Sequence, residues 1–351
     1  IDYQLPGRML FEANYVGNQS RDGVLSGPFT NPNLVPLGAF FKPDPITGIV
    51  NPITGNIPTG DYRPLQSYGD INLVGHGSYA NYNSIQTSLQ KQTGPVLLFI
   101  NYTFGKVLGV RDNYSGNGAS SGNTVDPFNM NNNYGVLAYD HTQIFNATYI
   151  IKMPSPVHGN AFAKGVVNGW QLSGASRVQS GAPLQPNTNG NMNANYGQTV
   201  IDGSTVGVGT TTWLGSNAAN LSLVPLVTCD PRSGLSSGQY FNPACFTPPP
   251  RGQNGTLIWP YIKGPAYFRS DLALFKSFKT TEHQRLEFRF SVFNFLNHPL
   301  PQFNTNGNGD VALSFSSGGN LTPTNTNTQT TGFPRYKVGD RLVTFAAKYY
   351  F

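Results

Sequence analysis

The residues of this chain whose types and spacing most directly suggest chemistry are its two cysteines, Cys229 and Cys245. They lie in a segment rich in glycine, proline and serine, which does not have the pattern of a strand. A disulfide between them would close a ring of about 17 residues and stabilise the segment by about 3 kcal/mol. Such a bond fits an oxidising compartment such as a periplasm or a cell surface. The alternative is a pair of free thiols, and a zinc site is not predicted because no histidine or further cysteine lies nearby.

The histidines and carboxylates do not form a catalytic pattern. The five histidines lie far apart in the sequence, at His76, His141, His158, His283 and His298. None has the spacing of a metal ligand to another histidine, a cysteine or a carboxylate. Asp140 directly precedes His141, and because neighbouring residues of a strand point to opposite faces, we interpret them as a polar pair at a strand end. We therefore predict that the chain is not an enzyme and uses no cofactor or metal.

Four aromatic residues outside the predicted strands are candidates for ligand recognition. They are Trp213, Tyr240, Trp259 and Tyr261. An aromatic ring offers a large apolar surface with a polar edge, which suits stacking on a ligand such as a sugar ring. The alternative is that these rings pack the loops against the rest of the protein, and the sequence leaves both interpretations open.

The residues named so far must be positioned by strands, which are recognised by alternating apolar and polar side chains. This alternation is clearest at the end of the chain, over residues 341–351. Every second residue there is apolar, namely Val343, Phe345, Ala347, Tyr349 and Phe351. The positions between them are mostly polar, as in the closing strand of an outer-membrane β-barrel, which has lipid on one side and a hydrated lumen on the other. We predict that these five residues are the signal for the barrel assembly machinery. A half-buried strand of a soluble sandwich is the alternative.

The composition favours the membrane interpretation. Charged residues make up 11% of the chain and aromatic residues 13%, which argues against disorder. No apolar run approaches the roughly 18 residues of a transmembrane helix. If the chain crosses a membrane, it therefore does so as strands, because a closed barrel satisfies every backbone group in lipid. The net charge of +6 comes from scattered lysines and arginines without a basic stripe, so no nucleic-acid partner is predicted.

The spacing of the alternating segments gives an independent test. Eight strands are predicted, at about 6–16, 79–92, 95–108, 134–153, 163–182, 265–280, 283–297 and 340–351. The joins between them are alternately long and short. Bacterial barrels have short periplasmic turns and long external loops, whereas a soluble sandwich has no reason to sort its loops by side. We therefore predict an all-β, antiparallel transmembrane barrel segment with long extracellular loops, both cysteines outside and the C-terminus in the periplasm.

The polar positions of these strands are candidates for the lumen. Six residues are predicted to face inward, namely Gln171, Arg177, Gln179, Arg285, Glu287 and Arg289. In a wide barrel they would contact a plug or the solute. The alternative is that they only keep the inner face wet.

An ordered series of short motifs also resembles a known family. The motifs stand at 12–18, 82–86, 169–174, 179–183, 240–246, 264–265, 271–278, 285–289 and 293–299. Together they cover nearly the whole chain and are similar to the C-terminal barrel of the Oar-like TonB-dependent outer-membrane receptors common in acidobacteria. The family often has an aspartate followed three residues later by a histidine. Here Asp140 is followed by Gln143, so no role of that histidine is carried over.

The resemblance implies a receptor of about 22 strands that holds an N-terminal plug, with this chain as its last third and the plug and N-terminal domains lying before Ile1. We expect TonB-coupled uptake of a scarce solute, with the TonB complex contacted by the missing N-terminal region. Outer-membrane lipid and an unknown extracellular ligand are the other expected partners. The alternative is a complete eight-stranded barrel that acts as an adhesin or a structural protein, because eight strands are also enough for a small closed barrel.

Overall fold

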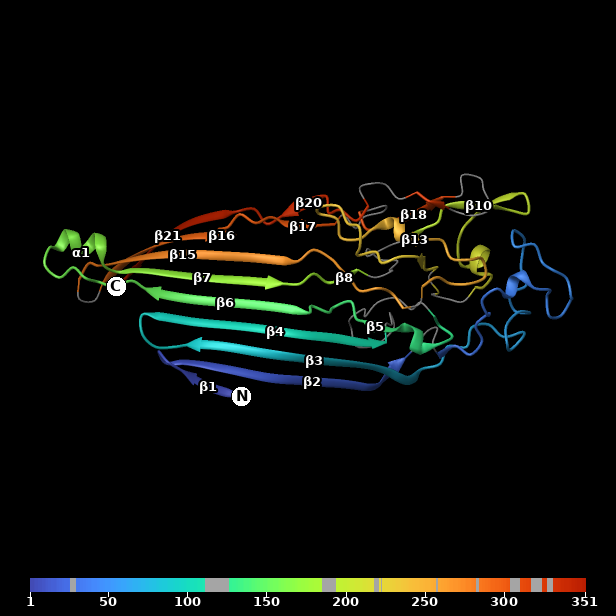
Figure 1. Cartoon of the computed structure of the whole chain (residues 1–351), viewed down its shortest axis with the longest axis horizontal. Helices are drawn as coiled ribbons and strands as arrows, with labels where there is room; N and C mark the ends of the chain where they lie inside the picture. The colour runs from blue at the N-terminus through green and yellow to red at the C-terminus, as the bar shows by residue number, and fades with distance from the viewer. Residues whose placement is uncertain are drawn as a thin grey trace.

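The computed structural model describes residues 1–25, 30–110, 126–184, 194–217, 221, 223–256, 258–281, 284–303, 310–316, 324–326 and 331–351. Its main element is one ten-stranded antiparallel sheet with the order β1-β2-β3-β4-β6-β7-β15-β16-β21, and β5 also pairs with β4 (Figure 1). The strands of this sheet are β1 (Asp2–Leu5), β2 (Met9–Leu25), β3 (Gly75–Lys91), β4 (Val96–Val110), β5 (Tyr134–Val136), β6 (Gln143–Lys152), β7 (Trp170–Gln179), β15 (Tyr267–Lys279), β16 (Arg285–Phe293) and β21 (Leu342–Tyr350).

The all-β antiparallel fold predicted from the sequence is confirmed, with four corrections to its strands. The strand predicted at 6–16 begins at Met9 and continues to Leu25 as β2. The segment 134–153 is not one strand, because a turn separates β5 from β6. The segment 163–182 begins in a helix, α1 (Ala161–Val167), and becomes a strand only at Trp170. The edge strand β1 was not predicted, because its four residues are too few for an alternation pattern to be recognised.

The registers of the strands place most of the alternating apolar residues on one face of the sheet. Leu274, Phe290 and Phe345 are direct neighbours on β15, β16 and β21. The rings of Phe290 and Phe345 lie 4.8 Å apart, yet the side chain of Phe345 remains 80% exposed. A face that is apolar over many strands and is not covered by protein requires an apolar environment. We call it the apolar face and the opposite one the polar face.

The long connections form a second layer beyond one end of the sheet, opposite the end that carries α1 and the C-terminus (Figure 1). Its small strands are β8 (Pro183–Leu184), β9 (Ala194–Asn195), β10 (Gln198–Ile201), β11 (Ser204–Gly207), β12 (Leu226–Val227), β13 (Phe246–Thr247), β14 (Ile262–Lys263), β17 (Leu300–Gln302), β18 (Leu313–Ser316), β19 (Thr324–Asn325) and β20 (Tyr336–Val338). Its short helical turns are η2 (Ala39–Phe41), η3 (Met130–Asn133), η4 (Thr210–Leu214) and η5 (Pro243–Cys245).

This loop layer has hydrophobic cores of its own. Phe241, Phe246 and Leu313 are buried together, which joins the segment before β14 to the segment before β21. A second cluster contains Phe40 from the connection between β2 and β3 and Ile201 from β10. Residues from three long connections therefore pack against one another, and the layer is an ordered part of the protein.

Both edges of the main sheet stay open in the part of the chain that the structure describes. The outer side of β1 and the outer side of β21 have no strand partner there. Among the described residues, no helix is long and apolar enough to cross a membrane.

Candidate functional site

The polar face of the sheet carries all six residues that the sequence predicts to be inward-facing. Gln171 and Arg177 lie on β7, and Glu287 and Arg289 lie on β16, at positions that alternate with the apolar residues. Gln179 and Arg285 complete the set on the same two strands. These side chains are not paired in one cluster. Arg177 donates to the Gln179 side chain at 2.7 Å, and Arg289 donates to Ser291 at 3.0 Å.

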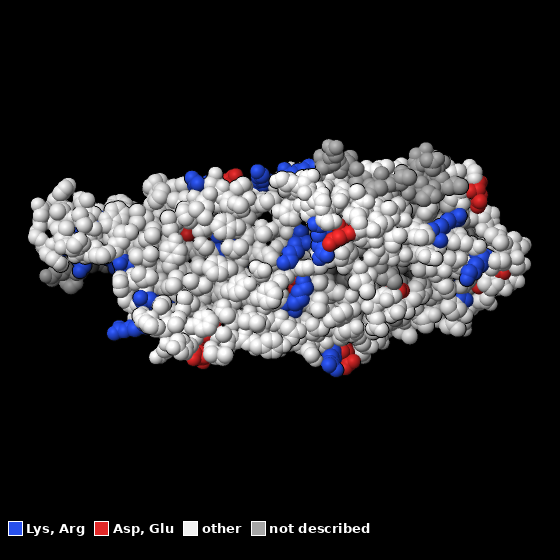
Figure 2. Space-filling model, in the orientation of Figure 1, with Lys and Arg blue, Asp and Glu red and all other residues white. Residues whose placement is uncertain are grey.

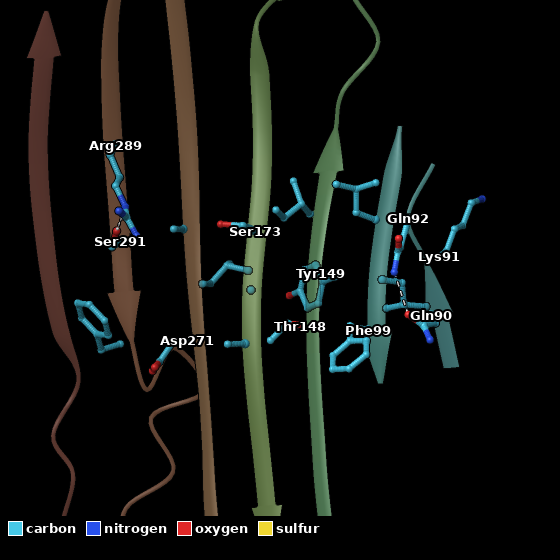
Figure 3. A pocket seen from close by; sticks show the side chains of 18 residues that line it. Gln90, Lys91, Gln92, Phe99, Thr148, Tyr149, Ser173, Asp271, Arg289 and Ser291 are labelled. Carbon is cyan, nitrogen blue, oxygen red and sulfur yellow. Dashed lines mark hydrogen bonds between the residues drawn. The ribbon is translucent and has the colours of Figure 1, made fainter. Parts of the chain in front are cut away.

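The polar face is hollowed into a groove of about 600 Å³ that crosses the sheet from β3 to β16. Figure 3 shows Arg289, Asp271, Ser173 and Thr148 along it, each from a different strand. Phe99 on β4 adds an apolar part to its floor. Side chains from several neighbouring strands line the groove. The strand registers therefore decide which residues meet in it.

Basic side chains outnumber acidic ones on the polar face between β6 and β21. The basic residues are Lys152, Arg177, Arg269, Lys279, Arg285, Arg289 and Lys348, and the acidic ones are Asp271 and Glu287. A wall with this excess attracts anions, because the charges of one sign add along its length. The opposite face of the sheet, which Figure 2 shows, carries few charged side chains.

Two arginines of this wall stand directly opposite each other on neighbouring strands, Arg177 on β7 and Arg269 on β15. Like charges at such positions repel. Each guanidinium has contacts of its own that reduce this repulsion. Arg269 pairs with Asp271 at 3.2 Å, and Arg177 lies 5.7 Å from the centroid of the Tyr267 ring. Arg177 has no carboxylate partner within the described residues, so this pair is a candidate place on the wall for an anion.

The loop layer is fastened to the rim of the sheet by a buried polar cluster around Asp140, which we call the latch. The carboxylate of Asp140 is 1% exposed and lies 3.1 Å from Lys106 Nζ on β4. It accepts hydrogen bonds from Val107 N at 2.8 Å, from Tyr261 OH at 2.8 Å and from Thr142 Oγ1 at 3.0 Å. Tyr261 belongs to the segment that leads into β14, so the latch joins distant parts of the chain.

The charges in the latch are stabilised by these contacts. Burial alone would raise the pKa of Asp140, but the hydrogen bonds from Val107, Tyr261 and Lys106 outweigh it and hold the pKa below its usual value. Burial raises the pKa of Tyr261 to about 12, and the hydrogen bond to Asp140 acts in the same direction. Lys106 Nζ also lies 3.2 Å from the centroid of the Tyr261 ring, which adds a cation–π contact. At neutral pH the latch therefore contains a carboxylate and a neutral phenol.

The position of Asp140 corrects the interpretation of its neighbour as well. Asp140 and His141 lie in the turn between β5 and β6, not in a strand. His141 Nδ1 lies 2.7 Å from the carbonyl oxygen of Ser180 and does not contact the carboxylate. His283 lies outside the described residues. In the remainder of the chain, as far as the structure describes it, no group of histidine, cysteine, aspartate and glutamate has metal-binding geometry.

The four loop aromatics occupy packing positions. The Trp213 ring is buried, and its indole N–H donates to Pro249 O at 2.8 Å. Trp259 stacks on Phe246, with 5.4 Å between the ring centroids. Tyr240 packs edge-on against Phe303, and Tyr261 belongs to the latch. In this structure Trp213 therefore has no free face for a ligand, and Tyr261 acts through its hydroxyl group.

The two cysteines and the terminal strand are also placed. Cys229 and Cys245 form a disulfide within the loop layer, with 5.0 Å between their Cα atoms. Val343, Phe345, Ala347 and Tyr349 lie on the apolar face of β21. Phe351 follows the strand and stacks on Tyr349 at 6.5 Å between centroids. The C-terminal aromatic pair is thus continuous with the apolar face.

A sheet with one uncovered apolar face and one hollowed polar face defines the wall of a membrane β-barrel. The family model described as "Outer membrane beta barrel domain" matches residues 1–336, so the chain belongs to this family and its place is the lipid of the outer membrane. Among solved structures, it is similar to the closed form of the ferric-catecholate import receptor Fiu from E. coli K12, with 8% identity and a TM-score of 0.39. That match covers 99% of this chain and 26% of the receptor, so the chain spans about a quarter of its length. No curated protein sequence matches the chain.

Proposed function

We propose that this chain forms part of the wall of a plugged outer-membrane receptor, of the Oar-like TonB-dependent kind that its motifs resemble, and that the receptor imports an anionic solute. The observation that carries the proposal is the hollowed polar face with its excess of basic side chains, below an ordered loop layer. A solute passing along this wall exchanges its hydration for guanidinium and ammonium groups, which favours an anion.

The open edges of the sheet support a larger barrel. Unpaired backbone groups in lipid are costly, so strands with free edges must find partners. In the proposal, the edges at β1 and β21 pair with further strands of the same barrel. The long loops face the outside, where they capture the solute, and the C-terminus faces the periplasm. The TonB complex supplies the energy through the N-terminal region that the resemblance implies, and this chain performs no enzymatic step.

The test is to follow which solutes disappear from the growth medium. Cells with and without the gene, each with and without TonB, are compared by untargeted mass spectrometry of the medium. The proposal expects at least one anionic solute whose depletion requires both the gene and TonB. If no solute depends on the gene while attachment of the cells to surfaces falls, the uptake function is refuted and the adhesin alternative is supported.

The solute then allows a test of the wall itself. Replacing both Arg177 and Arg269 by glutamine should slow its uptake, because two positive charges at directly opposite positions of the wall are removed. Lys152→Gln is the matched control, since it removes a positive charge from the polar face at the opposite end of the sheet. Equal uptake by the double variant and the control would refute the anion-binding role of the pair.

A further inference from the structure

The helix α1 lies at the end of the sheet away from the loop layer and packs onto the apolar face. Lys276 on β15 and Trp170 on β7 are paired neighbours on that face. The indole N–H of Trp170 donates to the Val166 carbonyl at 2.8 Å. The ring of Phe278 lies below Gly165, at 3.9 Å from the position that a Cβ would take. The carboxyl end of α1 is thus fixed to the surface that the rest of the sheet presents to lipid.

Lys276 is a basic residue among apolar neighbours on this face, and α1 explains its presence. Its side chain donates to the carbonyl oxygens of Val166 at 3.0 Å and of Asn168. Its ammonium group also lies 4.8 Å from the Trp170 ring centroid. The carbonyls at a helix end carry partial negative charge, so they stabilise the ammonium and leave the residue only 5% exposed. Lys276 therefore holds α1 in place without presenting a charge to lipid.

Between α1 and the sheet lies an apolar groove of about 720 Å³. It is lined mainly by rings and aliphatic side chains, including Trp170, Leu274, Phe278, Phe288, Phe290 and Phe345. It is continuous with the apolar face, and Figure 1 places α1 beside the C-terminus at the end of the short turns.

The exposed side chains of α1 have the pattern of a helix at a membrane boundary. Phe162 and Val166, which are four residues apart, are on one side of the helix and are 81% and 52% exposed, and Val166 also lines the groove. Lys164 lies two positions from each and therefore points to the other side, where it is exposed. Apolar side chains toward lipid and a basic side chain toward the phosphates are typical of interfacial helices.

We propose that α1 is a lipid-binding element, which dips Phe162 and Val166 into the membrane boundary while the groove beneath it holds the acyl chain of a phospholipid. The occupant is a lipid because the groove opens onto the face that already meets lipid, and because Lys164 can meet a phosphate group. The inference depends on the outer-membrane placement of the family and not on uptake, so a failed uptake experiment leaves it unaffected.

The position of α1 is tested in the intact protein in vesicles of phosphatidylethanolamine and phosphatidylglycerol, with and without brominated acyl chains. The variant Phe162→Trp reports on α1, as the difference between its emission and that of the parent protein. Phe128→Trp is the matched control, because Phe128 is also an exposed aromatic residue but lies near the loop layer. Quenching by bromine of the first variant alone is expected. Quenching of Phe162→Trp by aqueous iodide would place α1 in water. Quenching by neither iodide nor bromine would place it against protein. Either result would overturn the proposal.

The groove is tested by lipid retention. The detergent-purified intact protein should keep phospholipid after extensive detergent exchange, as measured by native mass spectrometry. Ala347→Trp fills the groove and should lose this phospholipid, whereas Ala13→Trp, on the apolar face near the opposite edge, should keep it. Equal retention by both variants, or no retained phospholipid in the parent protein, would refute the acyl-chain site.

Discussion

Replacing Phe345 by arginine should strongly destabilise the barrel, because the side chain lies on the apolar face near the middle of β21. An arginine near the midplane of the bilayer costs about 2–4 kcal/mol. Loss of the ring contact with Phe290, at 4.8 Å between centroids, adds about 0.5–1.5 kcal/mol. The combined loss of about 2.5–5.5 kcal/mol is a large part of the roughly 5–15 kcal/mol that stabilises a typical protein.

The neighbouring residue provides a control on the same strand. Thr344 lies on the polar face, opposite Ser291 of β16, so an arginine there faces the hydrated side. Thr344→Arg should lower the free energy of unfolding by less than about 1 kcal/mol. Surface substitutions away from packing and hydrogen-bond networks usually change it by about 0.5 kcal/mol or less.

Both variants can be compared by two measurements. Urea titration of the protein reinserted into phospholipid vesicles gives the free energy of unfolding, and immunoblotting of membrane fractions gives the amount that assembles in cells. We expect a large loss for Phe345→Arg in both measurements and a small one for Thr344→Arg. If Phe345→Arg assembled at normal levels, or if the two variants lost the same stability, the assignment of the apolar face to lipid would be refuted.

Three further predictions concern the loop layer. The pKa of Asp140 is lower in the folded protein than its ordinary value of 3.8, so the latch is intact above pH 3.8 and opens as the pH falls through the lowered pKa. Amide hydrogen exchange around the latch should therefore speed up at acidic pH. In Asp140→Asn these amides should exchange fast at every pH. Gly181→Ala should lower the stability of the protein by about 1–3 kcal/mol in thermal melts, since the added Cβ would lie 1.9 Å from a backbone oxygen. The control Gly207→Ala, whose Cβ would have nothing within 4 Å, should leave the melting temperature unchanged. Maleimide should label neither Cys229 nor Cys245 on intact cells before reduction, and labelling without reductant would contradict the disulfide. Reduction should lower the stability of the loop layer by about 3 kcal/mol.

The sequence was most informative about the strands, because the alternation of side chains between two faces is a local property of an extended backbone. The apolar set Leu286, Phe288 and Phe290 could be assigned to one face without knowing any partner strand, and the register confirms that these residues share it with Phe345. The local signal was weaker where another element replaced the strand. The predicted strand 163–182 began inside α1 and took in Val166, which belongs to that helix.

Lys276 is a second residue whose role cannot be predicted from local sequence patterns. A lysine in an apolar row of the sequence contradicts a lipid-facing strand, and nothing near it in the chain resolves the contradiction. The structure resolves it through Val166 and Asn168, more than a hundred residues away, whose carbonyl oxygens accept its hydrogen bonds. Such partners are invisible in a single sequence, because no local pattern relates them.

The sequence by itself thus determined that the chain is a membrane-spanning antiparallel sheet with one apolar and one polar face, because alternation, composition and strand length are local quantities. Only the tertiary structure decided what the long connections do. Their cores join residues as distant as Phe40 and Ile201, and the latch brings Tyr261 to Asp140. Loop packing depends on contacts between segments without regular periodicity, so it emerges only when the sheet has brought their ends together. For this reason the aromatic side chains that suggested ligand binding in the sequence are found in the cores and the latch that hold the loop layer together.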